Sequence, residues 1–437
     1  MKTVPFYYGH YHDPNILSSF ELQDQSSSQI KTSKKYSSCF TTMMNLLNTL
    51  IGAEILGIAN SMTLCGVYVS VGLMVICASL SYAATILVIR LQNRTGAESI
   101  NDLAAKLLGR WGGNLLSGLT LCFTYSCQVA YLVIGSETVN SWLNIAHLYE
   151  WESGWRRAII VFAYSMLLPI ALTIPKNMGF LDTASTAAIG CLVVFVIVMI
   201  VKACQMLPSQ GIEASVESYK FGLNIFNALA IYAMIFALPA IVLPLIKPFN
   251  PSLRKRYVLI GSAFMTCFTI ILLPSILGYL MFGKGTEQII FQNFSSSDII
   301  IQIVRVTFFF VVNASFPVVG IAVATDISDL IYHEHDPANL PWGKRIICLL
   351  IADAPPLLIA MVLPKVRPAL EIGGAFGGCL TNFFFPPMLW LKQSDKKLFH
   401  PTNILCMLFV GFGVISAAIA TYQAVIDAYH TFAGTEE

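Results

Sequence analysis

The sequence predicts an all-α membrane protein that crosses the bilayer about eleven times. Apolar residues make up 56 % of the chain and charged residues only 11 %, whereas soluble domains carry about 25 % charged residues. The apolar residues also gather in runs of about 20, the length that a helix needs to cross a hydrocarbon core of about 30 Å. A water-soluble chain of this length could not cover its surface with so few charges.

Hydropathy divides the chain into a polar tail at residues 1–37, a membrane domain at 38–430 and a short tail at 431–437. The first tail is rich in Ser, Gln and Lys and has no apolar stretch typical of a signal peptide, so we expect a largely disordered cytoplasmic segment. The predicted spans are, in chain order, 40–62, 67–91, 114–139, 157–174, 183–206, 222–246, 257–282, 300–324, 343–363, 369–391 and 402–428.

Loop charge gives the orientation, because cytoplasmic loops carry an excess of Lys and Arg. With the N-terminus in the cytoplasm, the inner segments and the helix ends beside them hold 18 of the 26 Lys and Arg residues. The outer segments hold the remaining 8. An odd number of spans then places the C-terminus on the outer side.

Two predicted spans are interrupted. In the first, Gly52 and Gly57 flank Glu54, and in the sixth, Pro239 and Pro244 fall within the apolar run. The two spans are five apart, the spacing of an inverted five-plus-five repeat, in which paired breaks mark a transporter's midplane site. Broken backbone in lipid is tolerated where ions, substrate or water satisfy it. The alternative interpretation is that these residues only kink the helices.

A series of motifs runs through residues of roughly 38–428 in a shared order and spacing. They are Asn45, Asn48, Gly52 and Ile55-Leu56-Gly57 in the first span, Asn101-Asp102-Leu103 after the second, Phe236 and Val242-Leu243-Pro244 in the sixth, Gly278 to Gly283 in the seventh, Arg305 and Pro317 in the eighth, and Gly374-Ala375 with Phe383 to Pro386 in the tenth. Together they resemble the amino acid/auxin permease superfamily, in particular its sodium-coupled neutral amino acid transporter branch.

This resemblance implies a LeuT-like fold in which helices 1 and 6 unwind at the midplane. It places the substrate between the first break and the sixth helix, and the coupling cation between helices 1 and 8, where oxygen ligands suit a hard cation. The implied substrate-binding residues are Gly52, Ala53, Glu54, Ile55 and Phe236, with Tyr125, Gln128 and Tyr232 as further polar candidates, and the implied cation-binding residues are Asn48, Asn313 and Ser315. Each polar candidate alone could equally be a packing contact between helices.

Glu54 departs from the resemblance, because the family usually has two small residues where this chain has Ala53 and Glu54. A carboxylate near the bilayer centre costs about 2.5–3.5 kcal/mol on insertion scales, so it is a candidate for function. Four roles are open for Glu54: a proton site, a neighbour of the coupling cation, a partner for a cationic substrate, and a hydrogen bond to nearby backbone. Asp353 and Asp427, which lie away from the breaks, were interpreted as structural.

We therefore predict a secondary active transporter of amino acids, coupled to sodium or protons. The alternatives are a transporter of cationic amino acids or amines, and a membrane amino-acid sensor with little or no transport. An enzyme is not expected, because no Cys-His-Asp constellation and no metal-ligand spacing occurs. The expected partners are an amino acid and the lipid bilayer, without nucleic acid and without a cofactor beyond Na+ or H+. We expect a multi-pass monomer in the plasma membrane or in a lysosomal or vacuolar membrane.

Overall fold

The computed structural model describes residues 36–52, 54–145, 154–176, 179–295, 298–332, 334 and 336–433. These residues are helical throughout the membrane domain, and no strand occurs among them. The N-terminal tail through residue 35, Ala53 and residues 434–437 lie outside the described part of the chain. The predicted all-α membrane fold is confirmed.

The helices follow the predicted spans in order. They are α2 (Cys39–Leu50), α3 (Ile55–Ser61), η1 (Met62–Leu64), α4 (Val67–Thr95), α5 (Ile100–Ile145), α6 (Gly154–Leu167), η3 (Ala171–Thr173), α7 (Gly179–Gln210), α8 (Ile225–Ile235), α9 (Val242–Ile246), α10 (Leu253–Phe282), η4 (Gly283–Gly285), η5 (Ile290–Asn293), α11 (Ile299–Tyr332), η6 (Pro337–Asn339), α12 (Trp342–Val362), α13 (Arg367–Gly373), the π-helix η7 (Gly374–Phe384), α14 (Phe385–Gln393) and α15 (Pro401–Ala433).

Eight of these helices are long and apolar enough to cross a membrane, and α2 with α3 makes a ninth if the bent pair counts as one span. The other two predicted spans, 222–246 and 369–391, are divided among shorter helices, α8 with α9 and α13 with η7 and α14. The count of eleven therefore stays a prediction, while helix occurs at every predicted position.

Both predicted interruptions are present, and the pieces lie side by side. α2 packs against α9, and α3 packs against α8. Each half of the first broken span thus contacts one half of the sixth. This is the arrangement expected of two antiparallel spans related by an inverted repeat.

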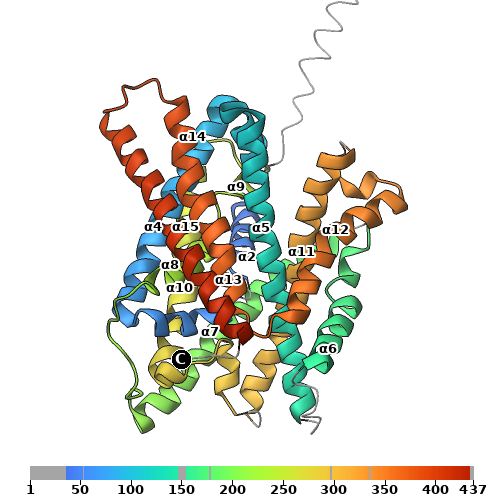
Figure 1. The fold of residues 1–437 in the computed structure, drawn as a ribbon, viewed down its shortest axis with the longest axis vertical. Coiled ribbons are helices and arrows are strands. Elements are labelled where there is room, and N and C mark those ends of the chain that lie inside the picture. The colour runs from blue at the N-terminus through green and yellow to red at the C-terminus, as the bar shows by residue number, and fades with distance from the viewer. Residues whose placement is uncertain are drawn as a thin grey trace, which may run out of the picture. The chain divides into compact units, whose positions relative to one another are not determined.

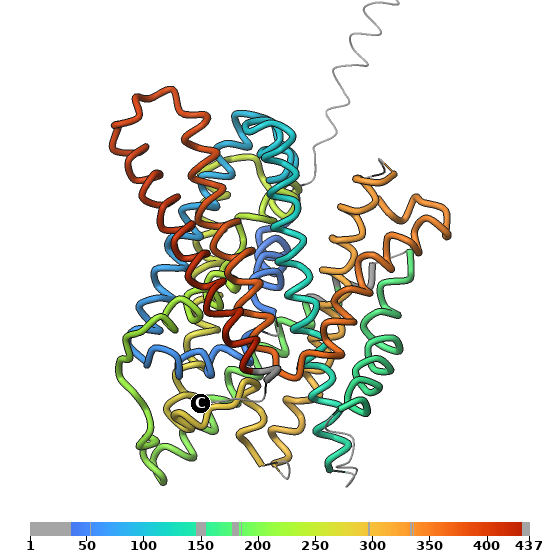
Figure 2. Tube along the Cα trace, in the orientation of Figure 1, coloured from blue at the N-terminus to red at the C-terminus, as the bar shows by residue number. Residues whose placement is uncertain are grey.

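The long helix α5 lies between two groups of helices (Figure 1). On one side it packs against α6, α11 and α12, and on the other against α13, η7 and α14. The tube view shows α6, α11 and α12 running together beside it (Figure 2). α5 thereby connects the broken helices to the group around α12.

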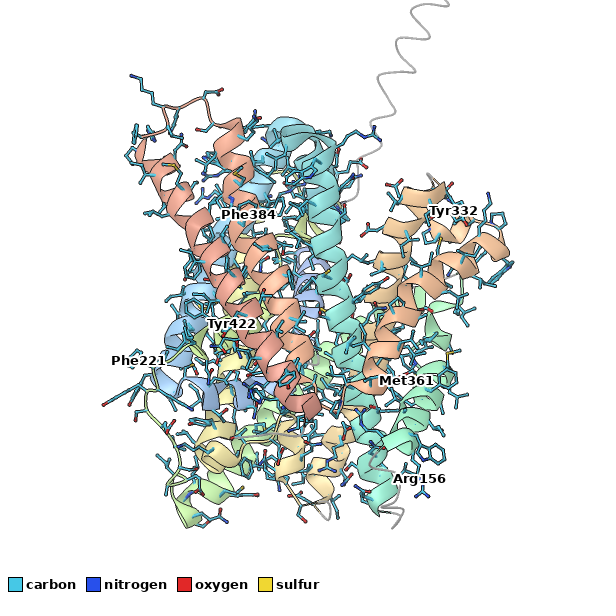
Figure 3. The ribbon with its side chains drawn as sticks, in the orientation of Figure 1. Arg156, Phe221, Tyr332, Met361, Phe384 and Tyr422 are labelled. Carbon is cyan, nitrogen blue, oxygen red and sulfur yellow. The ribbon has the colours of Figure 1, made fainter. Side chains whose placement is uncertain are left out.

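The loops sort to two ends of the helical domain. The connections α4–α5, α11–α12 and α14–α15 lie at the upper end in Figures 1 and 2, whereas the loop 211–224 and the end of α15 lie at the lower end. Arg156 at the start of α6 and Tyr332 at the end of α11 lie at opposite ends in Figure 3. The grouping matches the inner and outer segments expected from loop charge.

Two elements differ from the prediction. α5 begins at Ile100, well before the predicted start at residue 114, and kinks at Gly109, which has φ 79° and ψ 178°. The added turns are polar and carry the Asp102–Lys106 ion pair at 2.8 Å, so an apolar run cannot reveal them. The tenth span contains the π-helix η7, where Asn382 Nδ2 donates to the Ala233 carbonyl of α8 at 2.9 Å.

Candidate functional site

The first interruption leaves a short non-helical segment inside the membrane domain. α2 ends at Leu50, Ile51 is extended with φ −111° and ψ 96°, and α3 begins at Ile55. The two helices meet at an angle of 50°. Gly52, Glu54 and Ile55 are all buried, so the sequence pattern Gly-Ala-Glu does produce a buried break, with Ala53 outside the described residues.

The Glu54 carboxylate folds back over this segment. It accepts hydrogen bonds from its own backbone N–H and from the hydroxyl of Tyr131 on α5. A Cβ atom added at Gly52 would overlap the Glu54 carboxylate and lie 2.5 Å from the Tyr131 hydroxyl oxygen. Glycine at position 52 is thus what leaves room for the two polar groups. The structure shows the contact of one of the four roles considered for Glu54, the hydrogen bond to nearby backbone.

The second interruption faces the first. α8 ends at Ile235, and the chain is non-helical from Phe236 until α9 begins at Val242. The Phe236 side chain is fully buried, and its ring centroid lies 6.2 Å from that of Phe264 on α10. Tyr232, also fully buried, accepts a hydrogen bond of 2.9 Å from Ser61 Oγ at the end of α3. Tyr232 therefore ties α8 to α3 rather than opening into a cavity.

The candidate cation ligands lie on α2 and α11. Asn313 and Ser315 are buried on α11, and the Asn313 side chain donates to the Phe309 carbonyl at 2.7 Å and accepts from the Tyr164 hydroxyl at 3.3 Å. Asn48 lies on α2, which packs against α7, α9 and α10, whereas α11 packs against α5, α7 and α12. α7 is thus a neighbour that both helices share. In this conformation the Asn313 amide is engaged with α6.

Tyr125 and Gln128 face α12. The Tyr125 hydroxyl donates to the Ile351 carbonyl at 2.6 Å, and Gln128 Nε2 donates to Asp353 Oδ1 at 3.1 Å. Tyr131 lies one helical turn after Gln128 on α5 and faces Glu54 instead. The sequence analysis did not place Tyr131 at the site, because spacing alone does not show which neighbouring helix each face of α5 meets.

A charged network that the sequence did not predict links α13 to α15 and α8. Arg367 pairs with Glu371 and with Asp427, each at 2.7 Å, and Asn227 Nδ2 donates to Asp427 at 3.0 Å. Glu371 is fully buried. The available signal was a carboxylate inside the predicted span 369–391, four positions after an arginine.

A polar cavity of about 860 Å³ opens at the end of the domain that we assigned to the outer side. Its walls come from the end of α3, the loops before α8 and α11, the start of α13 and the end of α15. The lining residues are Asn60, Thr63, Leu64, Val133, Glu137, Lys220, Asn224, Lys284, Glu287, Gln288, Ile289, Gln292, Pro364 to Pro368, Gln423, Ile426, Asp427 and His430. None of the predicted site residues that the structure describes lines it.

The comparisons with known proteins agree with this geometry. Residues 35–426 match the family described as transmembrane amino acid transporter protein. The chain is 25 % identical over 430 residues to sodium-coupled neutral amino acid symporter 2 of Danio rerio, covering 91 % of this chain and 84 % of that protein.

A solved structure has a similar fold. It is that of Mhp1, a nucleobase-cation-symport-1 family transporter, in a closed conformation with bromovinylhydantoin bound. The similarity has a TM-score of 0.58 at 12 % identity, and it covers 91 % of this chain and 94 % of the Mhp1 chain. At this identity the likeness concerns the fold alone.

Proposed function

Because this chain belongs to the transmembrane amino acid transporter family, we propose that it is a sodium-coupled symporter whose amino acid substrate binds between the two helix interruptions. The observation that carries the proposal is the pairing of the breaks, with α2 against α9 and α3 against α8. Paired discontinuous helices supply backbone groups at the midplane for substrate and ion. Membership of this family favours neither a sensor nor an enzyme.

We infer that the Glu54 carboxylate competes with the substrate carboxylate for the same hydrogen-bond donors. The Glu54 carboxylate accepts hydrogen bonds from the Tyr131 hydroxyl and from a backbone N–H near Gly52. A substrate carboxylate needs donors of the same kind. Two carboxylates cannot share the same donors at close range without strong repulsion. Substrate entry therefore requires the Glu54 carboxylate to leave Tyr131, or to be protonated, before transport proceeds.

We further propose sodium as the coupling ion, bound by Asn48, Asn313 and Ser315. The support is the name of the zebrafish relative, a sodium-coupled symporter, and the amide and hydroxyl oxygens that these side chains offer. Asn313 must release the Tyr164 hydroxyl before its oxygen can face an ion.

Uptake by purified protein in liposomes tests the function. An inward sodium gradient should drive accumulation of neutral amino acids above the external concentration, and a sodium ionophore should abolish it. Asn48→Ala and Ser315→Ala should each raise the sodium concentration that gives half-maximal uptake, because a lost ligand costs about 1–3 kcal/mol. Leu405→Ala, at an exposed position of α15, is the matched control. Accumulation driven by a proton gradient alone would contradict sodium coupling.

A further inference from the structure

A second buried carboxylate, Asp353, lies in the middle of α12, away from the helix breaks. Its side chain is 3 % exposed, at a depth where an ionised carboxylate costs several kcal/mol unless a counter-charge meets it. Although the sequence suggested a structural role, its surroundings in three dimensions show a more specific one.

Three other elements converge on Asp353. Gln128 of α5 donates from Nε2 to Asp353 Oδ1 at 3.1 Å, and Thr173 Oγ of η3 lies 3.0 Å from Asp353 Oδ2. Gly320 of α11 presents bare backbone, since a Cβ there would come within 2.9 Å of Asp353 Oδ1 and 3.2 Å of Gln128 Nε2. The carboxyl group is therefore enclosed by α5, η3, α11 and its own helix.

No cation meets this carboxyl group among the described residues. Arg345, two turns earlier on α12, directs its guanidinium to the carbonyls of Thr173, Ile174 and Pro175 at 3.2, 3.3 and 2.8 Å. Several titratable side chains on the helices packed around Asp353 are bonded elsewhere: Tyr125 of α5 to the Ile351 carbonyl, Tyr164 of α6 to Asn313, and Arg157 of α6 to Glu137. Of the nearby lysines, Lys176 donates to the Leu340 carbonyl and Lys344 lies over the Tyr332 ring. On α11, Asp326 is a further carboxyl group, with Asp329 as its charged neighbour. The groups in contact with the carboxyl group are neutral.

The single hydroxyl proton of Thr173 bears on the charge of the Asp353 carboxyl group. Thr173 has one hydroxyl proton but two neighbours that could accept it, the Ile170 carbonyl at 2.7 Å and Asp353 Oδ2 at 3.0 Å. If the hydroxyl donates to the nearer Ile170 carbonyl, a carboxylate would place two acceptors against each other. A carboxylic acid removes the conflict, because its own O–H donates to Thr173 Oγ.

We propose that Asp353 is a proton-binding site, occupied by a proton in this conformation. Gln128 N–H donates to the carboxyl C=O, the carboxyl O–H donates to Thr173, and the Thr173 O–H donates to the Ile170 carbonyl, so each hydrogen is used once. The site is distinct from the Glu54 region and does not depend on the proposed transport function.

A metal cation fits this site less well than a proton. Sodium would require oxygen atoms turned toward the carboxylate, yet Gln128 presents its N–H group there, and its Oε1 has no hydrogen-bond partner among the described residues. Occupation by sodium would require the amide to turn around. The polarity of the Gln128 contact therefore favours a proton.

Infrared difference spectroscopy of the purified full-length protein tests the proposal. At neutral pH the wild-type protein should show a carboxylic-acid C=O stretching band that is missing in Asp353→Asn. The band should persist in Asp395→Asn, the matched control, because Asp395 is exposed in the loop before α15. An unchanged acid region in Asp353→Asn would overturn the proposal, as would a carboxylate band of Asp353 that shifts when sodium is removed.

Thr173→Val keeps the test decisive if Asp353→Asn does not fold. This variant retains the carboxyl group and removes its hydrogen-bond acceptor, so the acid band should move to higher frequency. A native state that holds this extra proton should also lose stability as the pH rises from the unfolded pKa of about 4 through the folded pKa, and Asp353→Asn should lack that loss. An acid band unaffected by Thr173→Val would contradict the proposed hydrogen-bond chain.

Discussion

Glu54 and Tyr131 belong to different helices, and both reach the space over Gly52. Glu54 stands out in the sequence because a carboxylate at this depth is costly. The structure adds that the carboxylate is held by two hydrogen-bond donors, its own backbone N–H and the Tyr131 hydroxyl. A group held by donors can be released when a competing acceptor arrives, which is why we assign it a role in substrate entry.

Gly52→Ala tests whether the space over the break is essential. The added methyl group would overlap the Glu54 carboxylate and the Tyr131 hydroxyl, and overpacking of this kind costs about 1–3 kcal/mol. We expect uptake to fall at least tenfold while the protein still inserts and purifies. Gly118→Ala is the control, because a Cβ on that residue of α5 meets nothing within 4 Å. Equal uptake by both variants would contradict a confined site at Gly52.

Glu54→Gln separates the roles left open for this residue. Glutamine keeps the shape but carries no charge and exchanges no proton. If Glu54 must leave Tyr131 before substrate binds, the weaker neutral hydrogen bond of glutamine should raise the affinity for neutral amino acids, and Tyr131→Phe should not add to that effect. The measurement is a double-mutant cycle on substrate affinity, with an expected coupling of about 1–2 kcal/mol.

Other outcomes of the Glu54→Gln experiment assign the residue differently. Loss of pH dependence with exchange intact would identify a proton site, and selective loss of Lys-like substrates would identify a partner for a cationic side chain. Additive effects of Glu54→Gln and Tyr131→Phe would show that the hydrogen bond between the two side chains does not control binding.

The sequence could assign these residues to helices, but it could not show which neighbouring helix each side chain contacts. Tyr125, Gln128 and Tyr131 recur at intervals of three, so they occupy the same broad side of α5. The first two nevertheless bond to α12, and the third bonds to Glu54. The direction of each depends on the crossing angles of helices that are distant in sequence, which no local pattern contains.

At the scale of elements, the breaks were predictable because they depend on local chemistry. Glycine and proline weaken helix regardless of the neighbours, so the interruptions at Gly52 and Pro239 could be read directly. The π-helix η7 could not, because its glycines allow contacts with other helices: a Cβ at Gly378 would lie 2.7 Å from the backbone of Ala233 on α8. Such close packing depends on how η7 and α8 meet, which the local sequence of either one does not show.

The start of α11 gives a prediction for pH. Asp298 accepts from the backbone N–H groups of Ile300 and Ile301 at 3.1 and 3.4 Å, and it pairs with Lys202 of α7. The hydrogen bond from Lys202 holds the pKa of Asp298 below its usual value. A depressed pKa in the folded state stabilises the protein above the unfolded pKa of about 4, and this contribution disappears as the pH falls through the folded pKa.

Thermal unfolding across acidic pH measures this contribution. Asp298→Asn retains a capping side chain but loses the charge, so it should lower the melting temperature slightly at neutral pH and flatten the acid-dependent loss. Asp298→Ala should cost about 1 kcal/mol more, because it also removes the cap. Asp395→Asn, at an exposed loop position, should behave like wild type. A wild-type acid profile in Asp298→Asn would show that the ion pair contributes nothing.

At the scale of the whole molecule, the fold was predictable because the bilayer restricts the choices. Backbone polar groups in lipid must be satisfied within the segment, so apolar runs of this length form helices. Charge then fixes their direction, and the loops of the structure fall at the two ends that the Lys and Arg distribution predicts. The span count is less certain from composition, since the sixth and tenth spans contain breaks that shorten their helices.

The last prediction follows from that arrangement and concerns topology. Two single-cysteine variants mark the two ends of the helical domain. Asp395→Cys lies in the loop between α14 and α15, where α15 begins. Phe221→Cys lies in the loop before α8, near the end of α15 (Figures 1 and 3). The 18-to-8 bias of Lys and Arg places Asp395 on the cytoplasmic side.

A membrane-impermeant maleimide applied to sealed vesicles of known orientation measures this directly. The variants are made in a background in which the exposed Cys39, Cys122 and Cys204 are replaced by serine. We expect Phe221→Cys and a cysteine placed after residue 430 to react from the outer or lumenal side, and Asp395→Cys to react only after permeabilisation. Reaction of the C-terminal cysteine only after permeabilisation, with Asp395→Cys reacting from the outer side, would require an even number of spans. One of the two interrupted segments, α8–α9 or α13–α14, would then have to return to the side from which it enters.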